Sequence, residues 1–234
     1  MLHLNPEDQI ATGVQRGVFV HPHDSGKLVK VLKDASTMPS RTNFNGVMDR
    51  LLPSTRLRQI RKEYQEYLRI MLKHHESEFH LPISHMFGFA STNLGLGCLT
   101  ERVMEPDGTL GQTLAAKVKT GTLSDEDLAL LNDAIARIYG YRIRAGDMNA
   151  KNFVIGHRHD GKNLGPRECV LVDGFGDIHA IPVRSLSNWT NRIGLDDSCT
   201  RLARKTKLKW NAANRQLERQ TEKGSDHAQT PRPH

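Results

Sequence analysis

Short apolar runs separated by turn residues dominate the first hundred positions of the chain. Three such regions, 9–33, 86–90 and 97–103, predict β-strands. Between the first two regions, apolar side chains recur at three- and four-residue steps from Leu57 to Met71, which predicts an amphipathic helix. Residues 34–53 are rich in Ser, Thr, Pro, Asn and Gly and predict a long loop.

Helical patterns are more frequent in the second half. Ser124 is followed three residues later by an acid, which is a helix-start signal, and a buried stripe then runs from Leu128 to Tyr139. We expect the basic stretch Ser185–Leu217 to be mainly helical and the polar tail from Glu218 to be mobile. Together the two halves predict an α+β protein.

Two polar loops carry the most informative chemistry. Asp147 and Asn152 lie five positions apart and precede an apolar run, and a later apolar run ends at Asp173. This order is typical of a kinase-type site, in which one Asp meets the acceptor hydroxyl while an Asn and a later Asp bind metal ions. Two unrelated polar turns are the alternative, because D-x-x-x-x-N often occurs by chance.

Candidates for the phosphate side of such a site lie nearer the N-terminus. Gly13 and Gly17 could let backbone N–H groups approach a phosphate, although an incomplete G-x-x-x-G also fits an ordinary hairpin. Lys30 lies in an apolar strand and could face either nucleotide phosphates or solvent. Glu63 and Glu66, on the following helix, could each orient this lysine or belong to a solvated face.

Composition and charge narrow the classes of site and the cell compartment to be considered. The chain has 234 residues, a formal net charge of +7 and three cysteines without C-x-x-C spacing, which disfavours a disulfide framework and a zinc site. Twelve scattered histidines form no recognised ligand motif. No apolar run approaches the ~20 residues that span a bilayer, and the N-terminus lacks the order of a signal peptide, so we expect a cytoplasmic protein.

In this order the features resemble a protein-kinase-like fold and, more closely, the YrbL family of kinase-like bacterial proteins in the PhoP regulatory network. The likeness runs from about residue 8 to 190 and rests on short motifs in sequence order: Thr12-Gly13, Phe19-Val20-His21-Pro22, Val29-Lys30-Val31, Arg61-Lys62-Glu63-Tyr64, Lys151-Asn152-Phe153-Val154-Ile155 and Val172-Asp173. It implies a two-lobed α+β fold, with a small β-rich N-lobe over 1–103, a reduced, mainly helical C-lobe over 104–217, and a mobile tail over 218–234.

The resemblance also implies a role for each candidate residue. Asp147 would accept or orient the acceptor hydroxyl, while Asn152 and Asp173 would bind Mg²⁺. Lys30, fixed by Glu63, would touch the phosphates of ATP. The glycine loop would cover those phosphates through Gly13, Val14, Gln15, Arg16 and Gly17. The hinge would meet adenine through Glu101 to Val103.

Departures from the kinase pattern decide between substrate classes. Ala145-Gly146 replaces the usual His-Arg, the metal motif reads Asp-Gly-Phe-Gly from Asp173, and only about sixty residues follow it. We therefore expect phosphoryl transfer to a small-molecule, glycan or lipid hydroxyl rather than to a peptide. The same departures leave a non-catalytic nucleotide-binding or regulatory protein as the alternative. A third hypothesis is that the basic stretch Arg201–Arg219 contacts an anionic surface, although a solvated basic helix is more usual.

Overall fold

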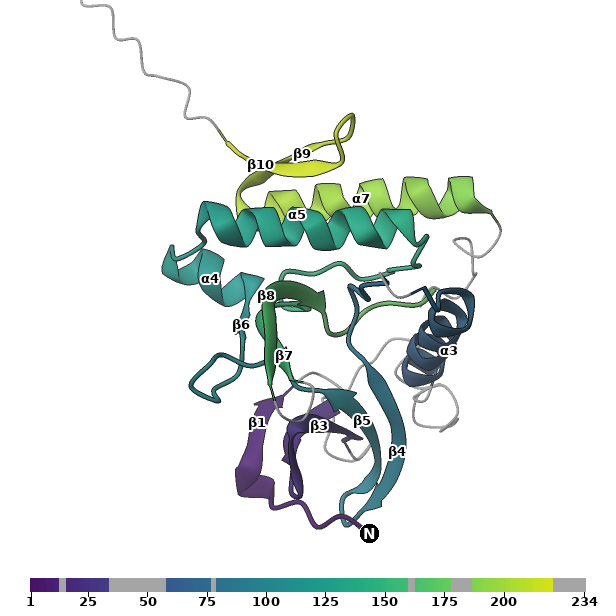
Figure 1. The fold of residues 1–234 in the computed structure, drawn as a ribbon, viewed down its shortest axis with the longest axis vertical. Helices are drawn as coiled ribbons and strands as arrows, with labels where there is room; N and C mark the ends of the chain where they lie inside the picture. The colour runs from purple at the N-terminus through teal and green to yellow at the C-terminus, as the bar shows by residue number, and fades with distance from the viewer. Residues whose placement is uncertain (13–15, 34–57, 77–78, 160–162, 178–186, 221–234) are drawn as a thin grey trace, which may run out of the picture.

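The computed structural model describes residues 1–12, 16–33, 58–76, 79–159, 163–177 and 187–220. Its N-terminal part is a five-stranded antiparallel sheet of order β1-β2-β3-β5-β4. The strands are β1 (Gln9–Thr12), β2 (Arg16–His21), β3 (Asp24–Leu32), β4 (Met86–Thr92) and β5 (Gly95–Glu101), and a 3₁₀ turn, η1 (Pro6–Asp8), precedes them. Helix α3 (Arg58–Lys73) lies beside this sheet (Figure 1).

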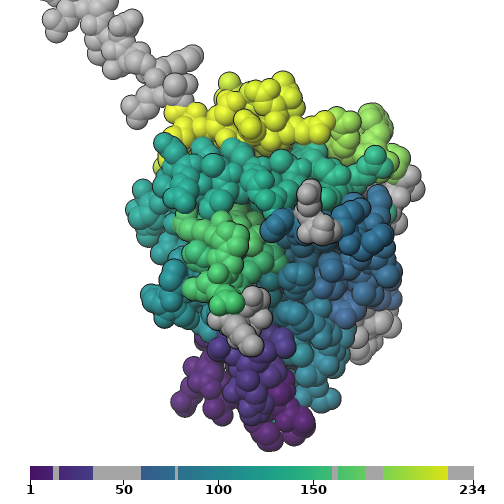
Figure 2. Space-filling model, viewed as in Figure 1, coloured from purple at the N-terminus to yellow at the C-terminus, as the bar shows by residue number. Residues whose placement is uncertain are grey.

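The C-terminal part consists of helices around a small sheet. Strands β6 (Gln112–Thr113), β7 (Phe153–His159) and β8 (Leu164–Leu171) form this sheet in the order β6-β7-β8. Its helices are α4 (Leu114–Thr120), α5 (Asp125–Gly140) and α7 (Asn188–Thr206). Figure 1 shows α5 and α7 side by side near the end of the molecule farthest from the N-terminal sheet, and Figure 2 shows the two parts stacked along the long axis.

Period-two alternation along β3 explains how the N-terminal sheet presents a lysine. Val29 and Val31 are 0% and 3% exposed and pack with Phe19 and Leu4 in a small core. Lys30 lies between the two valines, so its side chain leaves the opposite face of the strand. The sheet therefore holds Lys30 on the face away from this small core.

Helix α5 forms as its sequence predicts. The Ser124 side chain accepts from the Asp127 N–H, and the Asp127 carboxylate accepts from the Ser124 N–H, which completes a capping box. Its buried stripe includes Leu131, Ile135 and Ile138, all fully buried in the main core. This helix carries the chain toward Asp147.

The end of the described chain differs from the prediction. Residues 208–219 are expected to continue a basic helix or to start a mobile tail, but they form the hairpin β9 (Leu208–Asn211) and β10 (Gln216–Arg219). Lys207 adopts a left-handed conformation with φ 57°, which ends α7. Leu208 and Leu217 are buried in the main core, so apolar burial holds the hairpin on the helices.

These elements confirm the expected mixed α+β class, with a β-rich N-terminal part and a mainly helical C-terminal part. Among the described residues, no helix has the length and apolar character needed to cross a membrane. The expected loop at 34–53 lies outside the described residues.

Candidate active site

A cavity of about 660 Å³ lies between the two parts of the chain. It brings together Lys30, Asp147, Asn152 and Asp173, which are the four side chains predicted to contact nucleotide, acceptor and metal. Sheet residues line one side, and residues from the loop after Ile143 and the end of β8 line the other. Segments more than a hundred positions apart therefore contribute to a single cleft.

Hydrogen bonds fix the two acidic loops against each other. The Asp147 N–H donates to the Gly174 carbonyl at 3.0 Å, and the Gly174 N–H donates to Asp173 Oδ1 at 2.8 Å. Asn152 Nδ2 donates to the Asp147 carbonyl at 3.0 Å and lies 3.4 Å from Asp147 Oδ2. Since Nδ2 faces Asp147, the Oδ1 of Asn152 is left as an acceptor for a cation.

The glycines of the Asp-Gly-Phe-Gly motif permit this close approach. Gly174 has φ +80°, and a Cβ there would lie 2.4 Å from the Asp147 carbonyl oxygen. Gly176 has φ +92°, and a Cβ there would lie 2.8 Å from the Lys62 carbonyl of α3. The extra glycine after Asp173 is therefore what lets the metal motif pack on the loop that carries Asp147.

Lys30 is 7% exposed and donates from Nζ to the Val172 carbonyl at 2.7 Å. This bond ties β3 to the residue immediately before Asp173. The expectation that Glu63 fixes Lys30 is wrong in this arrangement, because the Glu63 carboxylate binds Arg16 instead. The two Arg16–Glu63 contacts are 3.0 and 3.1 Å, with side-chain exposures of only 8% and 3%.

Arg16 was predicted only as a member of the loop over the phosphates, but its side chain contacts two carboxylates of the site. Its guanidinium also lies 3.5 Å from Asp173 Oδ1, so it bridges the two carboxylates. Gln59 Nε2 contacts both of them as well, at 3.0 Å from Glu63 and 3.2 Å from Asp173. We call Arg16, Glu63 and Asp173 the arginine–carboxylate cluster. A planar, forked guanidinium suits this bidentate role better than an ammonium group.

The cluster has an uneven charge distribution. Burial raises the pKa of Glu63 from 4.5 to about 7, and the adjacent Asp173 charge adds to the rise while Arg16 opposes it. Burial alone would also raise the pKa of Asp173, but the charges of Arg16 and Lys30 hold it well below its usual range. The pair therefore keeps one proton on Glu63 up to neutral pH while Asp173 stays ionised.

Glu66, the other candidate on α3, serves a different contact. Its carboxylate accepts from the Arg144 N–H at 2.7 Å and from the Arg69 side chain at 3.0 Å. It is 3% exposed and ties α3 to the segment that leads into Asp147. Of the two glutamates, Glu63 is the one beside the cleft residue Asp173.

The proposed hinge also lines the cavity, through Glu101 and Val103. The Glu101 carboxylate is held by Arg158 at 2.7 and 2.9 Å, and the Glu101 N–H donates to the His85 carbonyl at 3.0 Å, so both groups already have partners. The Val103 carbonyl accepts from the Gly111 N–H at 3.0 Å. In the predicted glycine loop, Gly17 belongs to strand β2, while Gly13, Val14 and Gln15 lie outside the described residues.

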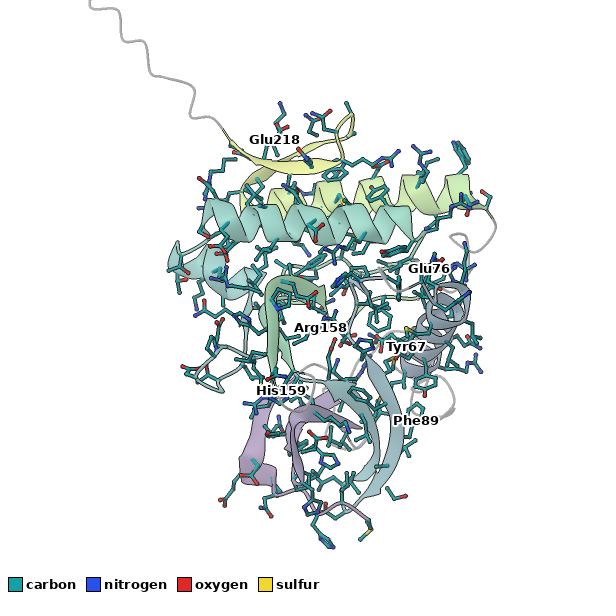
Figure 3. All side chains as sticks on the ribbon, viewed as in Figure 1. Tyr67, Glu76, Phe89, Arg158, His159 and Glu218 are labelled. Carbon is teal, nitrogen blue, oxygen red and sulfur yellow. The ribbon has the colours of Figure 1, made fainter. Side chains whose placement is uncertain are left out.

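Arg158 joins the two parts of the chain behind the cleft. Besides Glu101, it contacts Glu168 at 2.9 Å and the Leu81 and Ile83 carbonyls at 2.6 and 3.1 Å. Figure 3 places it between the N-terminal sheet and the helices. Sequence reasoning missed this residue, because its partners Glu101, Leu81 and Ile83 lie in segments far from it in the chain.

Sequence reasoning also missed Thr100, Gln59 and Lys151, which all line the cavity. The buried Thr100 hydroxyl has no hydrogen-bond partner among the described residues, which leaves a donor facing a ligand site. Period-two alternation from Cys98, the cross-strand partner of Lys30, could have placed Thr100 on the cleft face.

The donor set fits a magnesium ion that also binds phosphate oxygens. Asp173 offers one carboxylate and Asn152 one amide oxygen, both hard ligands. Among the described residues, no group of three His, Cys, Asp or Glu side chains could hold a metal alone. Mg²⁺ often uses one or two protein carboxylates and takes its remaining ligands from water and substrate phosphates.

Comparison with protein families identifies the chain. The model of the PhoP regulatory network protein YrbL family matches residues 2–207. The chain belongs to the YrbL family. This match confirms the resemblance drawn from the sequence. In this YrbL-family protein, the matched region contains every candidate site residue and ends before hairpin β9–β10. Among curated proteins, none matches the chain significantly.

Solved structures similar to this YrbL-family chain include two kinds of protein. A crystal structure of WbdD shares 12% identity over 70% of this chain and 31% of the WbdD chain, with a TM-score of 0.43. This chain therefore spans about a third of the length of WbdD. The PknI kinase domain of Mycobacterium tuberculosis shares 14% identity over 83% of this chain and 71% of that domain, with a TM-score of 0.44.

Proposed function

We propose that this protein transfers a phosphoryl group from Mg-ATP to a hydroxyl of a small-molecule, glycan or lipid acceptor in the cytoplasm. The observation that supports the proposal is the meeting of Lys30, Asp147, Asn152 and Asp173 in one cavity of about 660 Å³. An ammonium group, two carboxylates and an amide are the side chains that such a transfer uses.

Each of the four groups has a role that its surroundings support. Lys30 is fixed by Val172 and would neutralise phosphate charge, while Asn152 Oδ1 and Asp173 would hold Mg²⁺. The magnesium ion would supply charge neutralisation at the phosphates. Asp147 is exposed, and its backbone N–H is bound to Gly174, so the carboxylate is positioned to orient an acceptor hydroxyl.

The test is phosphate transfer or release from ATP by the full chain, compared with Asp147→Asn. Asp133→Asn is the matched control, because Asp133 is an exposed carboxylate on α5 that pairs with Arg137 and does not line the cavity. We expect Asp147→Asn to lose nearly all turnover and Asp133→Asn to retain it. Equal turnover in Asp147→Asn and the wild-type protein would contradict the proposal.

The arginine–carboxylate cluster favours a second candidate, a non-catalytic nucleotide-binding protein. Arg16 contacts the Asp173 carboxylate that would bind the metal, so a cation bound there competes with a guanidinium. Thermal shifts with ATP, with and without Mg²⁺, distinguish the two. A nucleotide-dependent shift that Asp173→Asn abolishes, without turnover on any acceptor, would favour this candidate over the kinase.

A further inference from the structure

A second concave site lies at the segment that leads into Asp147, between the end of α3 and the start of α7. Two adjoining hollows of about 200 and 190 Å³ share Arg142, Asn188 and Asn191. The larger one is otherwise lined by Arg69, Lys73, Arg144 and Ser187. None of the four cavity residues assigned to phosphoryl transfer lines either hollow.

The larger hollow carries an excess of positive charge. Four cationic side chains line it, and the buried Glu66 balances part of this charge through Arg69 and Arg144. Lys73 and Arg142 are exposed and have no acidic partner in the part of the chain that the structure describes. The start of α7 adds the positive end of its dipole and the N–H of the lining residue Asn188, whereas the Thr190 N–H already donates to Ser187 Oγ at 3.1 Å.

Asn191 supplies an independent sign of a ligand. It is 4% exposed, lines both hollows, and its Oδ1 has no hydrogen-bond partner among the described residues. Its Nδ2 faces the Ile143 carbonyl at 3.3 Å and the Arg142 carbonyl at 3.5 Å, which fixes the amide orientation because only NH₂ can donate. The buried Oδ1 is therefore an acceptor without a donor, and a hydroxyl of a bound molecule would supply one.

We propose that this hollow binds a phosphate group that carries, or is attached to, a hydroxyl. Cations and the Asn188 N–H would bind the phosphate oxygens, while the hydroxyl would donate to Asn191 Oδ1. Protonated inorganic phosphate and hydroxyl-bearing phosphate esters provide both features, whereas sulfate has no donor near neutral pH. The site is independent of the proposed phosphoryl transfer, since the two share no assigned residue.

Trp189 gives a direct readout. It lies in the first turn of α7 and is 70% exposed, and the chain has only one other tryptophan, Trp210. In a Trp210→Phe background, its fluorescence is titrated with inorganic phosphate and with sulfate at constant ionic strength. We expect a saturable change with phosphate and weaker binding of sulfate. No saturable change, or equal affinity for the two anions, would overturn the proposal.

Variants locate the site. Arg142 has φ 55°, a left-handed conformation that Asn tolerates, so Arg142→Asn removes the charge without added backbone strain. We expect Arg142→Asn and Lys73→Gln each to weaken phosphate binding about tenfold, as loss of a charged hydrogen bond predicts. Arg204→Asn, an exposed position in the last turn of α7, is the matched control and should leave it unchanged. Equal weakening by Arg204→Asn would indicate non-specific attraction and overturn the proposal.

Two further arms distinguish the source of the phosphate. Glycerol phosphate is titrated in the same assay, and flotation is measured with phosphatidylcholine vesicles that contain or lack phosphatidic acid. Binding of vesicles only when phosphatidic acid is present, with loss in Arg142→Asn, would identify a lipid headgroup. Binding of glycerol phosphate without flotation would identify a soluble phosphate ester. If glycerol phosphate, phosphatidic acid vesicles and inorganic phosphate all fail to bind, the proposed site is overturned.

Discussion

Replacing Glu63 by Gln removes one titratable group from the arginine–carboxylate cluster while keeping its shape. Burial, together with the adjacent Asp173 charge, raises the pKa of Glu63 to about 7, so the protonated form is favoured in weakly acidic solution. A glutamine amide resembles the protonated acid in size and can donate to Asp173 in the same way. The Arg16 guanidinium keeps one of its acceptors in the side-chain carbonyl of the introduced glutamine. We therefore expect Glu63→Gln to fold.

The structure sets both the sign and the size of the effect. The pKa of Glu63 rises from 4.5 to about 7 on folding, so between these values the folded state holds a proton that the unfolded state has released. Stability then falls with rising pH by up to about 1.4 kcal/mol per pH unit. Over the whole window the wild-type protein loses on the order of 3 kcal/mol relative to Glu63→Gln. Above about pH 8 the difference is constant.

The assay is urea unfolding at fixed ionic strength between about pH 5 and 8. The two proteins differ only at position 63, so the difference between their free energies of unfolding isolates Glu63. Asp173 does not interfere, because its lowered pKa places its titration below this range. Glu7→Gln, an exposed glutamate in η1, is the control and should run parallel to wild type. If the free energy of unfolding of Glu63→Gln also ran parallel to that of the wild type across this pH range, the raised pKa of Glu63 would be refuted.

Three other substitutions test how the site is supported. Arg158→Met leaves Glu101 buried without its cation, and urea unfolding should show a loss of about 3–5 kcal/mol; a loss near zero would contradict the role of Arg158 in joining the two parts. Gly174→Ala should cost clearly more than Gly108→Ala, because their φ values of +80° and +82° match but only a Cβ at Gly174 would contact the Asp147 loop. Equal losses would show that backbone conformation, not crowding, matters there. Ser124→Ala should lower stability by about 1 kcal/mol through the lost cap, and an unchanged midpoint would argue against the capping box.

Local patterns predicted those features whose causes are local. The capping residues of α5 lie three positions apart, so a short-range pattern places the start of this helix. Lys30 sits between two apolar neighbours, a pattern that leaves both the phosphates and solvent open, and only its place in the family order favours the phosphates. The meeting of Asp147 with Asp173 was predicted from motif order and family likeness. Its close packing depends on Gly174, whose need for a positive φ explains why the motif departs from Asp-Phe-Gly.

Long-range pairing was not predictable in the same way. Arg16 and Glu63 are 47 positions apart, and nothing in either local pattern shows that Arg16, rather than Lys30, reaches the carboxylate. The prediction of a helix and a mobile tail at residues 208–219 was wrong for a related reason. The basic residues of this stretch fit a helix, while the left-handed Lys207 and the burial of Leu217 against the C-terminal core depend on tertiary packing.

Under the proposed function, the arginine–carboxylate cluster links cation binding to protonation. A divalent cation at Asp173 has to share the carboxylate that now contacts Arg16 at 3.5 Å. The same cation would lower the pKa of Glu63, because a nearby positive charge favours the ionised form. Ionised Glu63 would then hold Arg16 more strongly through its two contacts of 3.0 and 3.1 Å, which frees Asp173 for the metal. The proton on Glu63 and the metal at Asp173 therefore oppose each other, and a lysine in place of Arg16 could not form the same forked pair.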